Sequence, residues 1–268
     1  MPTVTINGDE MFYRHNGADE RADGLAVVLV HGAGGSTADW PASWLDMQQA
    51  DETRLSSVPV IAVDLPGHGK SAGASRQSVA GYAEAIAGFL DALNLQRVLL
   101  VGHSMGAAIA LTLAADKNPR LAGISLLAGA AKLAVSPAIL DGLQNQFEAT
   151  VGNIVKYSWH REVDDDLKQA ARERLLNCPQ NVVYDDFLAC SRYDLTDRLV
   201  DVAIPVLIVA AADDRMVPAE TAVSLSEKLG TSKQTVLDNC GHYLQIEKAA
   251  LTSDTLADFL ANDLANGI

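Results

Sequence analysis

The sequence is poor in positive charge for its length. Of its 268 residues, 20 are lysine or arginine and 34 are aspartate or glutamate, so the formal net charge is −14 at pH 7. A chain with this balance repels the phosphates of nucleic acids and the surface of anionic membranes. We therefore expect neither a nucleic-acid partner nor a membrane partner. The oligomeric state is left open.

Cysteine is scarce, and long apolar runs are missing. The three cysteines, Cys178, Cys190 and Cys240, are odd in number and lack the spacing of metal ligands, which predicts free thiols in a reducing compartment and no metal site. No uncharged apolar stretch reaches the length of a membrane span. The first residues lack the basic start and apolar core of a signal peptide. Together these absences predict a cytoplasmic protein.

Short apolar segments bounded by loop signals are abundant. Asn7-Gly8 lies between the segments TVTI and EMFYRH and predicts a β-hairpin with a tight turn. Helical spacing of apolar residues occurs over 78–94 and 251–265, and it alternates with apolar runs. Continuous runs of this kind predict buried strands of a mostly parallel sheet, and the alternation predicts an α/β fold. The runs are 25–30, 58–65, 97–102, 123–129, 205–211 and 234–238.

The alternation breaks between residues 131 and 199, where one crossover helix would suffice. The apolar spacing of this stretch is helical, and it is richer in tyrosine, tryptophan and charge. It predicts a helical cap, or lid, inserted between two parts of a core formed by 1–130 and 200–268. An irregular crossover is the alternative.

A serine between two glycines follows the run 97–102. In the segment Gly102-His103-Ser104-Met105-Gly106 the apolar run ends and an alanine-rich helical stretch begins. A sharp turn from strand to helix holds a serine hydroxyl above the edge of a sheet, and glycines on both sides allow the close approach that this turn requires. This context predicts that Ser104 is a nucleophile, with helix capping as the alternative role.

A serine nucleophile needs a base and an acid that orients the base. His242 follows the last predicted strand, where the base of such a sheet is expected. After the run 205–211 come Asp213 and Asp214, in a loop at the carboxyl end of a strand, which is the ligand side of an open α/β sheet. We predict His242 as the base and Asp214 as the acid, and Asp213 as a turn or cap residue.

The glycine-rich segment His31-Gly32-Ala33-Gly34-Gly35-Ser36 follows the first run of the core. Its glycines free the backbone to direct N–H groups at an oxyanion. We predict one donor at the N–H of Met105 and the other at the N–H of Ala33, with Gly34 as the less favoured choice. Glycine-rich turns also bind phosphate, but no Lys-Ser or Lys-Thr pair comes directly after this one.

Five segments together make the sequence resemble the α/β-hydrolase superfamily, in the order usual for it: HGAGGS, DLPGHGKS, GHSMG, ADDRMVP and CGHYLQIE. The resemblance implies an eight-stranded, mostly parallel sheet with a lid between the sixth and seventh strands. It implies the same roles for Ser104, Asp214, His242, Ala33 and Met105, and it implies no metal and no organic cofactor.

The resemblance leads to a serine hydrolase that cleaves a small carboxylic ester or related acyl substrate. One alternative is a carbon–carbon hydrolase of meta-cleavage diketones; those enzymes typically carry asparagine before the nucleophile and tryptophan after the histidine, where this chain has His103 and Tyr243. Their substrate carboxylate would need a cation, for which Arg161, Arg192 and Arg198 are candidates. The resemblance also allows a cofactor-free haloperoxidase or perhydrolase and, from a different class, a ligand-binding receptor.

The substrate pocket is the least determined part of the site. We name Gly34, His103, Trp159, Tyr193 and Tyr243 as candidates for its lining. The aromatic residues of the insertion serve equally well as an acyl pocket or as the core of the lid itself: Phe147, Tyr157, Trp159, Tyr184, Phe187 and Tyr193.

Overall fold

The computed structural model describes residues 2–18, 24–46 and 53–264. Within them, eight strands form one sheet in the order β1-β2-β4-β3-β5-β6-β7-β8. The pairs β1–β2 and β2–β4 are antiparallel, and every later pair is parallel. The strands are β1 (Thr3–Ile6), β2 (Asp9–His15), β3 (Leu25–Val30), β4 (Val60–Val63), β5 (Arg97–His103), β6 (Leu121–Leu127), β7 (Val206–Ala211) and β8 (Ser232–Leu237). The predicted fold class is confirmed.

Each predicted apolar run contains one strand, but some bounds differ. The run 58–65 is longer than β4, which ends at Val63. The chain leaves the sheet there because the N–H of Leu65 donates to the imidazole Nε2 of His31, at 3.0 Å, instead of to a neighbouring strand. Strands β6 and β8 each begin two residues before the predicted runs.

The side chains of the central strands alternate between two cores. Val28 and Val30 face the layer that contains α1 (Val79–Ala92), α2 (Met105–Ala115) and α7 (Glu220–Lys228). Val27 and Leu29 face the opposite layer, which contains α9 (Ala249–Phe259) and the tryptophans of two short 3₁₀ segments. Because both faces are covered, the strands have no polar alternation, as expected for a parallel sheet.

The helices of the core begin and end close to their predicted bounds. The hydroxyl of Ser78 accepts a 3.2 Å hydrogen bond from the N–H of Gly81 and caps α1. The predicted helix 251–265 is α9 with a π-helical turn, Leu260–Leu264, after it; residue 265 lies outside the described residues. A short helix, α8 (Leu244–Glu247), precedes α9.

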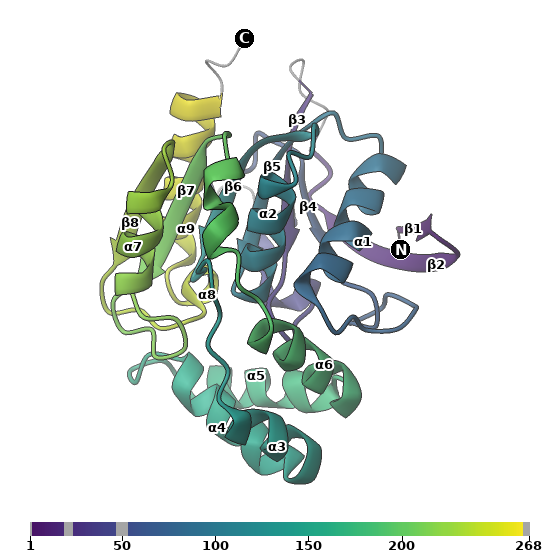
Figure 1. Ribbon diagram of the computed structural model, residues 1–268, viewed down its shortest axis with the longest axis vertical. Helices are drawn as coiled ribbons and strands as arrows, with labels where there is room; N and C mark the ends of the chain where they lie inside the picture. Colours follow the sequence, from purple (N-terminus) through teal and green to yellow (C-terminus); the bar gives the residue numbers. More distant parts are fainter. Residues whose placement is uncertain (1, 19–23, 47–52, 265–268) are drawn as a thin grey trace.

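Four helices connect β6 to β7, and we call them the cap helices: α3 (Pro137–Asn145), α4 (Phe147–Ser158), α5 (Asp165–Asn177) and α6 (Gln180–Ser191). They lie together at one end of the molecule, at the bottom of the view in Figure 1. They share a small apolar core that includes Leu143, Val151, Trp159 and Val183. The helical part is narrower than the predicted insertion of 131–199, because its last residues, such as Leu195 and Leu199, pack in the core of the sheet.

The described residues hold no group of three or more histidine, cysteine or acidic side chains that could bind a metal ion. In the same part of the chain, no helix combines the length and the apolar character that crossing a bilayer requires. The three cysteines form no disulfide bond, and Cys190 and Cys240 are buried.

Candidate active site

Ser104 lies at the turn between β5 and α2. Its backbone has φ 54° and ψ −113°, a conformation that costs energy for a residue other than glycine. The glycines on each side allow this turn: a Cβ atom on Gly106 would lie 2.1 Å from the carbonyl oxygen of Val30, and one on Gly102 would lie 2.0 Å from that of Gly106. The close approach of β3, β5 and α2 therefore holds Ser104 in its strained geometry.

Asp214 and His242 form a buried pair. The imidazole Nδ1 of His242 donates to Asp214 Oδ2 at 2.7 Å, and the backbone N–H groups of Met216 and Val217 donate to Oδ1 at 2.7 and 3.0 Å. Burial disfavours the carboxylate, but the charge and hydrogen bond of His242, with the two N–H groups, outweigh burial and hold the pKa of Asp214 below its usual value. The side chain of Asp213 is half exposed, and its Oδ2 lies 3.8 Å from Nε2 of His160.

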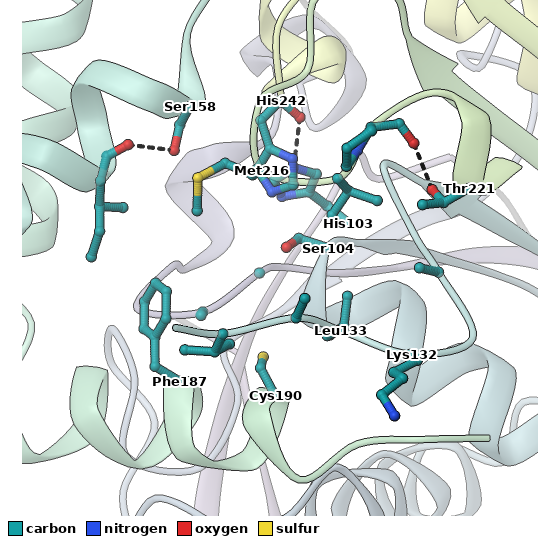
Figure 2. A pocket seen from close by; sticks show the side chains of 18 of the residues that line it. His103, Ser104, Lys132, Leu133, Ser158, Phe187, Cys190, Met216, Thr221 and His242 are labelled. Atoms are coloured by element: carbon teal, nitrogen blue, oxygen red, sulfur yellow. Dashed lines mark hydrogen bonds between the residues drawn. The ribbon is translucent and has the colours of Figure 1, made fainter. Parts of the chain in front are cut away.

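Ser104 and His242 line the same cavity, which has a volume of about 120 Å³ (Figure 2). Because Nδ1 of His242 donates to Asp214, Nε2 is the ring atom that can accept a proton in the cavity. Most of the wall is apolar, and α4 and α6 of the cap contribute to it together with loops of the core. Its members include Ala33, Leu133, Ile154, Phe187, Met216 and Val217.

His103 also lines the cavity, directly before Ser104. Its Nε2 donates to the carbonyl oxygen of His242 at 2.9 Å. Burial first, and then the neighbouring His242, lower the pKa of His103 to about 3. The ring is therefore neutral at ordinary pH, and its Nδ1 is a buried acceptor that has no partner among the described residues.

The two predicted oxyanion donors have no other hydrogen-bond partner in the described ranges. This holds for the N–H of Ala33, in the loop after β3, and for that of Met105, the first residue of α2. Gly34, the less favoured choice, differs: its N–H donates to Asp186 Oδ2 at 2.7 Å. That bond occupies the donor, so Gly34 is unsuitable for the role.

The structure separates the predicted pocket residues. Tyr243 lines the cavity, as does Phe187 among the aromatic residues of the insertion. Trp159 does not: it is 1% exposed, packs in the core of the cap helices and stacks on Tyr243 with ring centroids 4.7 Å apart. Tyr193 is buried in the core beneath the sheet face that carries α2, and Gly34 packs against Leu175 of α5. Three of the predicted pocket residues therefore pack inside the protein and do not line this cavity: Trp159, Tyr193 and Gly34.

Sequence reasoning missed the residues that join the cap to the site. The carbonyl of Ser158 accepts a 2.8 Å hydrogen bond from the N–H of His242. Asp186, on α6, accepts from three different segments of the core. Neither residue belongs to a recognisable motif, since each acts on a segment far away in the sequence.

Comparisons with known proteins identify the family of the chain. The model of the alpha/beta hydrolase family matches residues 27–255. The chain is 28% identical over 262 residues to a 2-hydroxy-6-oxo-6-phenylhexa-2,4-dienoate hydrolase of Comamonas testosteroni, covering 90% of each chain. It is 32% identical over 260 residues to a 2-hydroxy-6-oxo-2,4-heptadienoate hydrolase of Pseudomonas putida, covering 89% of this chain and 90% of the other.

The solved structures extend the similarity to the whole fold. The enol-lactonase from Burkholderia xenovorans LB400 superimposes with a TM-score of 0.86 at 21% identity, covering 97% of this chain and 100% of the other. The sheet order, the family match over most of the chain and hydrolase relatives aligned along nearly its full length lead to one conclusion. The chain belongs to the α/β-hydrolase family and is a hydrolase.

Proposed function

We propose that the protein hydrolyses a small, neutral carboxylic ester through an acyl-enzyme on Ser104. The observation that carries this proposal is the wall of the cavity. It is mostly apolar, and its one lysine or arginine within the described residues, Lys132, already pairs with Asp194 at 2.8 Å. A substrate with a buried carboxylate would need an unpaired cation, whereas an uncharged acyl group needs only apolar contact.

In the proposed mechanism, His242 Nε2 removes the proton of the Ser104 hydroxyl as its oxygen attacks the ester carbonyl. Asp214 holds the imidazole in the tautomer that leaves Nε2 free, and it stabilises the imidazolium that forms. The imidazolium then protonates the leaving alcohol. Water, activated by the same imidazole, attacks the acyl-enzyme and releases the acid.

The N–H groups of Ala33 and Met105 are the proposed oxyanion donors. They support the tetrahedral intermediate because neither is committed to another partner among the described residues. Each such donor is worth about 2.7–4 kcal/mol of activation free energy in related chemistry. The cap helices are proposed to set acyl-chain preference, since Ile154 of α4 and Phe187 of α6 are part of the apolar wall.

The second candidate is carbon–carbon bond hydrolysis of a meta-cleavage diketone, and the curated relatives favour it over ester hydrolysis. The same triad would act on a ketone carbonyl next to the bond that breaks. The cations considered for the substrate carboxylate are not in the cavity wall. Arg161 lies 3.7 Å from Glu162, Arg198 lies 2.9 Å from Asp116, and Arg192 donates weakly to the carbonyl of Gln77. Lys132 is the remaining cation for this role.

One experiment separates the two candidates. Purified protein is assayed with p-nitrophenyl butyrate and with 2-hydroxy-6-oxo-6-phenylhexa-2,4-dienoate, and Ser104→Ala serves as the blank for each. The ester proposal expects a kcat/KM for the ester at least about 100-fold above that for the dienoate, a difference of roughly 2.7 kcal/mol. The reverse ranking would assign carbon–carbon hydrolysis.

A pair of lysine variants tests the same question at the binding step. If a substrate carboxylate binds Lys132, then Lys132→Met raises KM for the dienoate and leaves KM for the neutral ester unchanged. Lys117→Met is the matched control, because Lys117 also lies near an aspartate, 3.8 Å from Asp201, but it is not part of the cavity wall. Under the ester proposal, neither variant changes KM for p-nitrophenyl butyrate by more than about twofold.

A further inference from the structure

A fully buried carboxylate lies at the boundary between the cap helices and the core. Asp186 belongs to α6 and is 0% exposed. Its Oδ2 accepts from the N–H of Gly34 and from Nε2 of His68, each at 2.7 Å, and its Oδ1 accepts from the hydroxyl of Tyr82 at 2.5 Å. The three donors come from the loop after β3, the loop after β4 and helix α1. One cap side chain thus holds three separate segments of the core.

The bond to His68 is an ion pair. Nδ1 of His68 donates to the carbonyl of Pro66 at 3.1 Å and Nε2 donates to Asp186, so both ring nitrogens carry hydrogen. Burial opposes the charge, but the carboxylate of Asp186 outweighs burial and raises the pKa of His68 above its usual value. Desolvation makes a buried ion pair a poor source of stability. The main effect of Asp186 is therefore on the geometry of the segments that it binds.

That geometric consequence falls on the segment His31–Ser36, which we call the oxyanion loop. Gly34 has φ +64°, and a Cβ atom there would lie 2.3 Å from Leu175 of α5. Asp186 holds the N–H of Gly34 at the same point. The residue before it, Ala33, lines the cavity and keeps its own N–H uncommitted among the described residues. The cap therefore fixes the peptide that directly follows the proposed oxyanion donor.

We infer that Asp186 is a positioning residue of the oxyanion hole: by binding the N–H of Gly34, this cap carboxylate fixes the orientation in which the N–H of Ala33 meets the oxyanion. The inference rests on the proposed serine-hydrolase function. It means that the oxyanion hole is complete only when the cap helices are docked on the core. Stabilisation of the transition state by the oxyanion hole then requires that the cap helices are docked on the core.

Four substitutions separate positioning from stability. Asp186→Ala removes every acceptor, whereas Asp186→Asn keeps an oxygen for the N–H of Gly34 and is the conservative rescue. Tyr82→Phe removes one bond to the same carboxylate without touching the oxyanion loop. Asp185→Asn is the matched control on α6, because Asp185 accepts from Ser75 and Gln77 and not from the loop. If Asp186→Ala does not fold, Asp186→Leu fills the same space without an acceptor.

Each variant is assayed for kcat and KM with p-nitrophenyl butyrate, for affinity to a trifluoromethyl ketone and for melting temperature. Titration of Ser104 with a fluorophosphonate corrects kcat for the active fraction. We expect Asp186→Ala to lower kcat by about 10²-fold and to leave KM within about threefold of the wild-type value, because a misplaced oxyanion donor acts on the transition state. The affinity for the trifluoromethyl ketone should fall in parallel with kcat. Asp186→Asn should recover most of kcat, and Tyr82→Phe should lower the melting temperature only.

The outcomes that contradict the inference differ from those that contradict the function. If wild-type protein is labelled at Ser104 and hydrolyses the ester, but Asp186→Ala keeps kcat within about threefold of Asp185→Asn, the inference is wrong and the proposed function stands. The inference is equally wrong if Tyr82→Phe loses as much kcat as Asp186→Ala. If wild-type protein is neither labelled nor active on the ester, the proposed function itself fails.

Discussion

The backbone N–H of His242 donates a 2.8 Å hydrogen bond to the carbonyl of Ser158, the last residue of cap helix α4. The connection continues on both sides of it, since Trp159 stacks on Tyr243, and the N–H groups of His160 and Gly241 both donate to Glu247. The proposed catalytic base is therefore held by the same cap that reaches the oxyanion loop through α6. The cap helices thus help to hold both the proposed base and the loop of the proposed oxyanion donor.

The first prediction concerns the nucleophile. Ser104→Ala should lose nearly all ester turnover, because the variant has no oxygen to attack the carbonyl, and the loss should reach several orders of magnitude. The melting temperature should not fall, since alanine is small and Ser104 lies at the cavity. A fluorophosphonate should label wild-type protein at Ser104, as read by peptide mass spectrometry. Active protein that remains unlabelled at Ser104 would overturn the mechanism.

The second prediction compares two neighbouring aspartates. Asp214→Asn should lower kcat by about 10⁴-fold, as the corresponding change does in a serine protease, because the amide favours the wrong tautomer of the base. Asp213→Asn should cost less than about tenfold, since its half-exposed carboxylate does not contact His242. Steady-state kinetics on the two purified variants gives the ranking, and the reverse ranking would show that the acid was misassigned.

The third prediction separates the cap core from the cavity wall. Trp159→Ala should lower the free energy of unfolding by about 3–5 kcal/mol, because a large buried ring is lost, and it should leave the ranking of p-nitrophenyl esters by acyl length unchanged. Phe187→Ala removes a ring from the cavity wall, so it enlarges the cavity and should shift the ester ranking toward longer acyl chains. Urea unfolding and kcat/KM across chain lengths test both. A changed ranking in Trp159→Ala would return Trp159 to the pocket.

The fourth prediction concerns the pH dependence of stability. The pKa of His68 is raised in the folded state, so its contribution to stability is fully present below the unfolded pKa of about 6.5 and is lost as pH rises through the folded pKa. The neighbouring His31, with its ring 4.9 Å away, adds no charge, because burial and the charge of His68 lower its pKa.

Urea unfolding measured from pH 6 to pH 9 checks this prediction. The free energy of unfolding of wild-type protein should fall as pH rises above about 6.5, the unfolded pKa of histidine. His68→Gln should flatten that slope and should be less stable than wild type at pH 6. An identical slope in both proteins would mean that the group responsible lies elsewhere.

Local sequence patterns were sufficient for the fold class and for the main candidates of the site. A strand such as β5 is set by consecutive apolar residues, and the glycines around Ser104 report a turn whose geometry depends on its own neighbours. The same holds for Asp214 and His242, which follow predicted strands and therefore lie at one edge of the sheet. In the structure, Ser104 and His242 line one cavity, and the 2.7 Å hydrogen bond from Nδ1 of His242 to Oδ2 of Asp214 joins the third residue to them.

What only the tertiary structure decided depends on segments that are far apart in the chain. Aromatic residues of the insertion have the same composition whether they face the cavity or each other, and only packing assigned Phe187 to the cavity wall and Trp159 to the cap core. From the sequence, Gly34 remained a possible oxyanion donor. Only the folded chain shows that its N–H donates to the carboxylate of Asp186, 152 residues further along. Asp186 carries no local signal, because a buried carboxylate is recognisable only by the donors that the folded chain gathers around it.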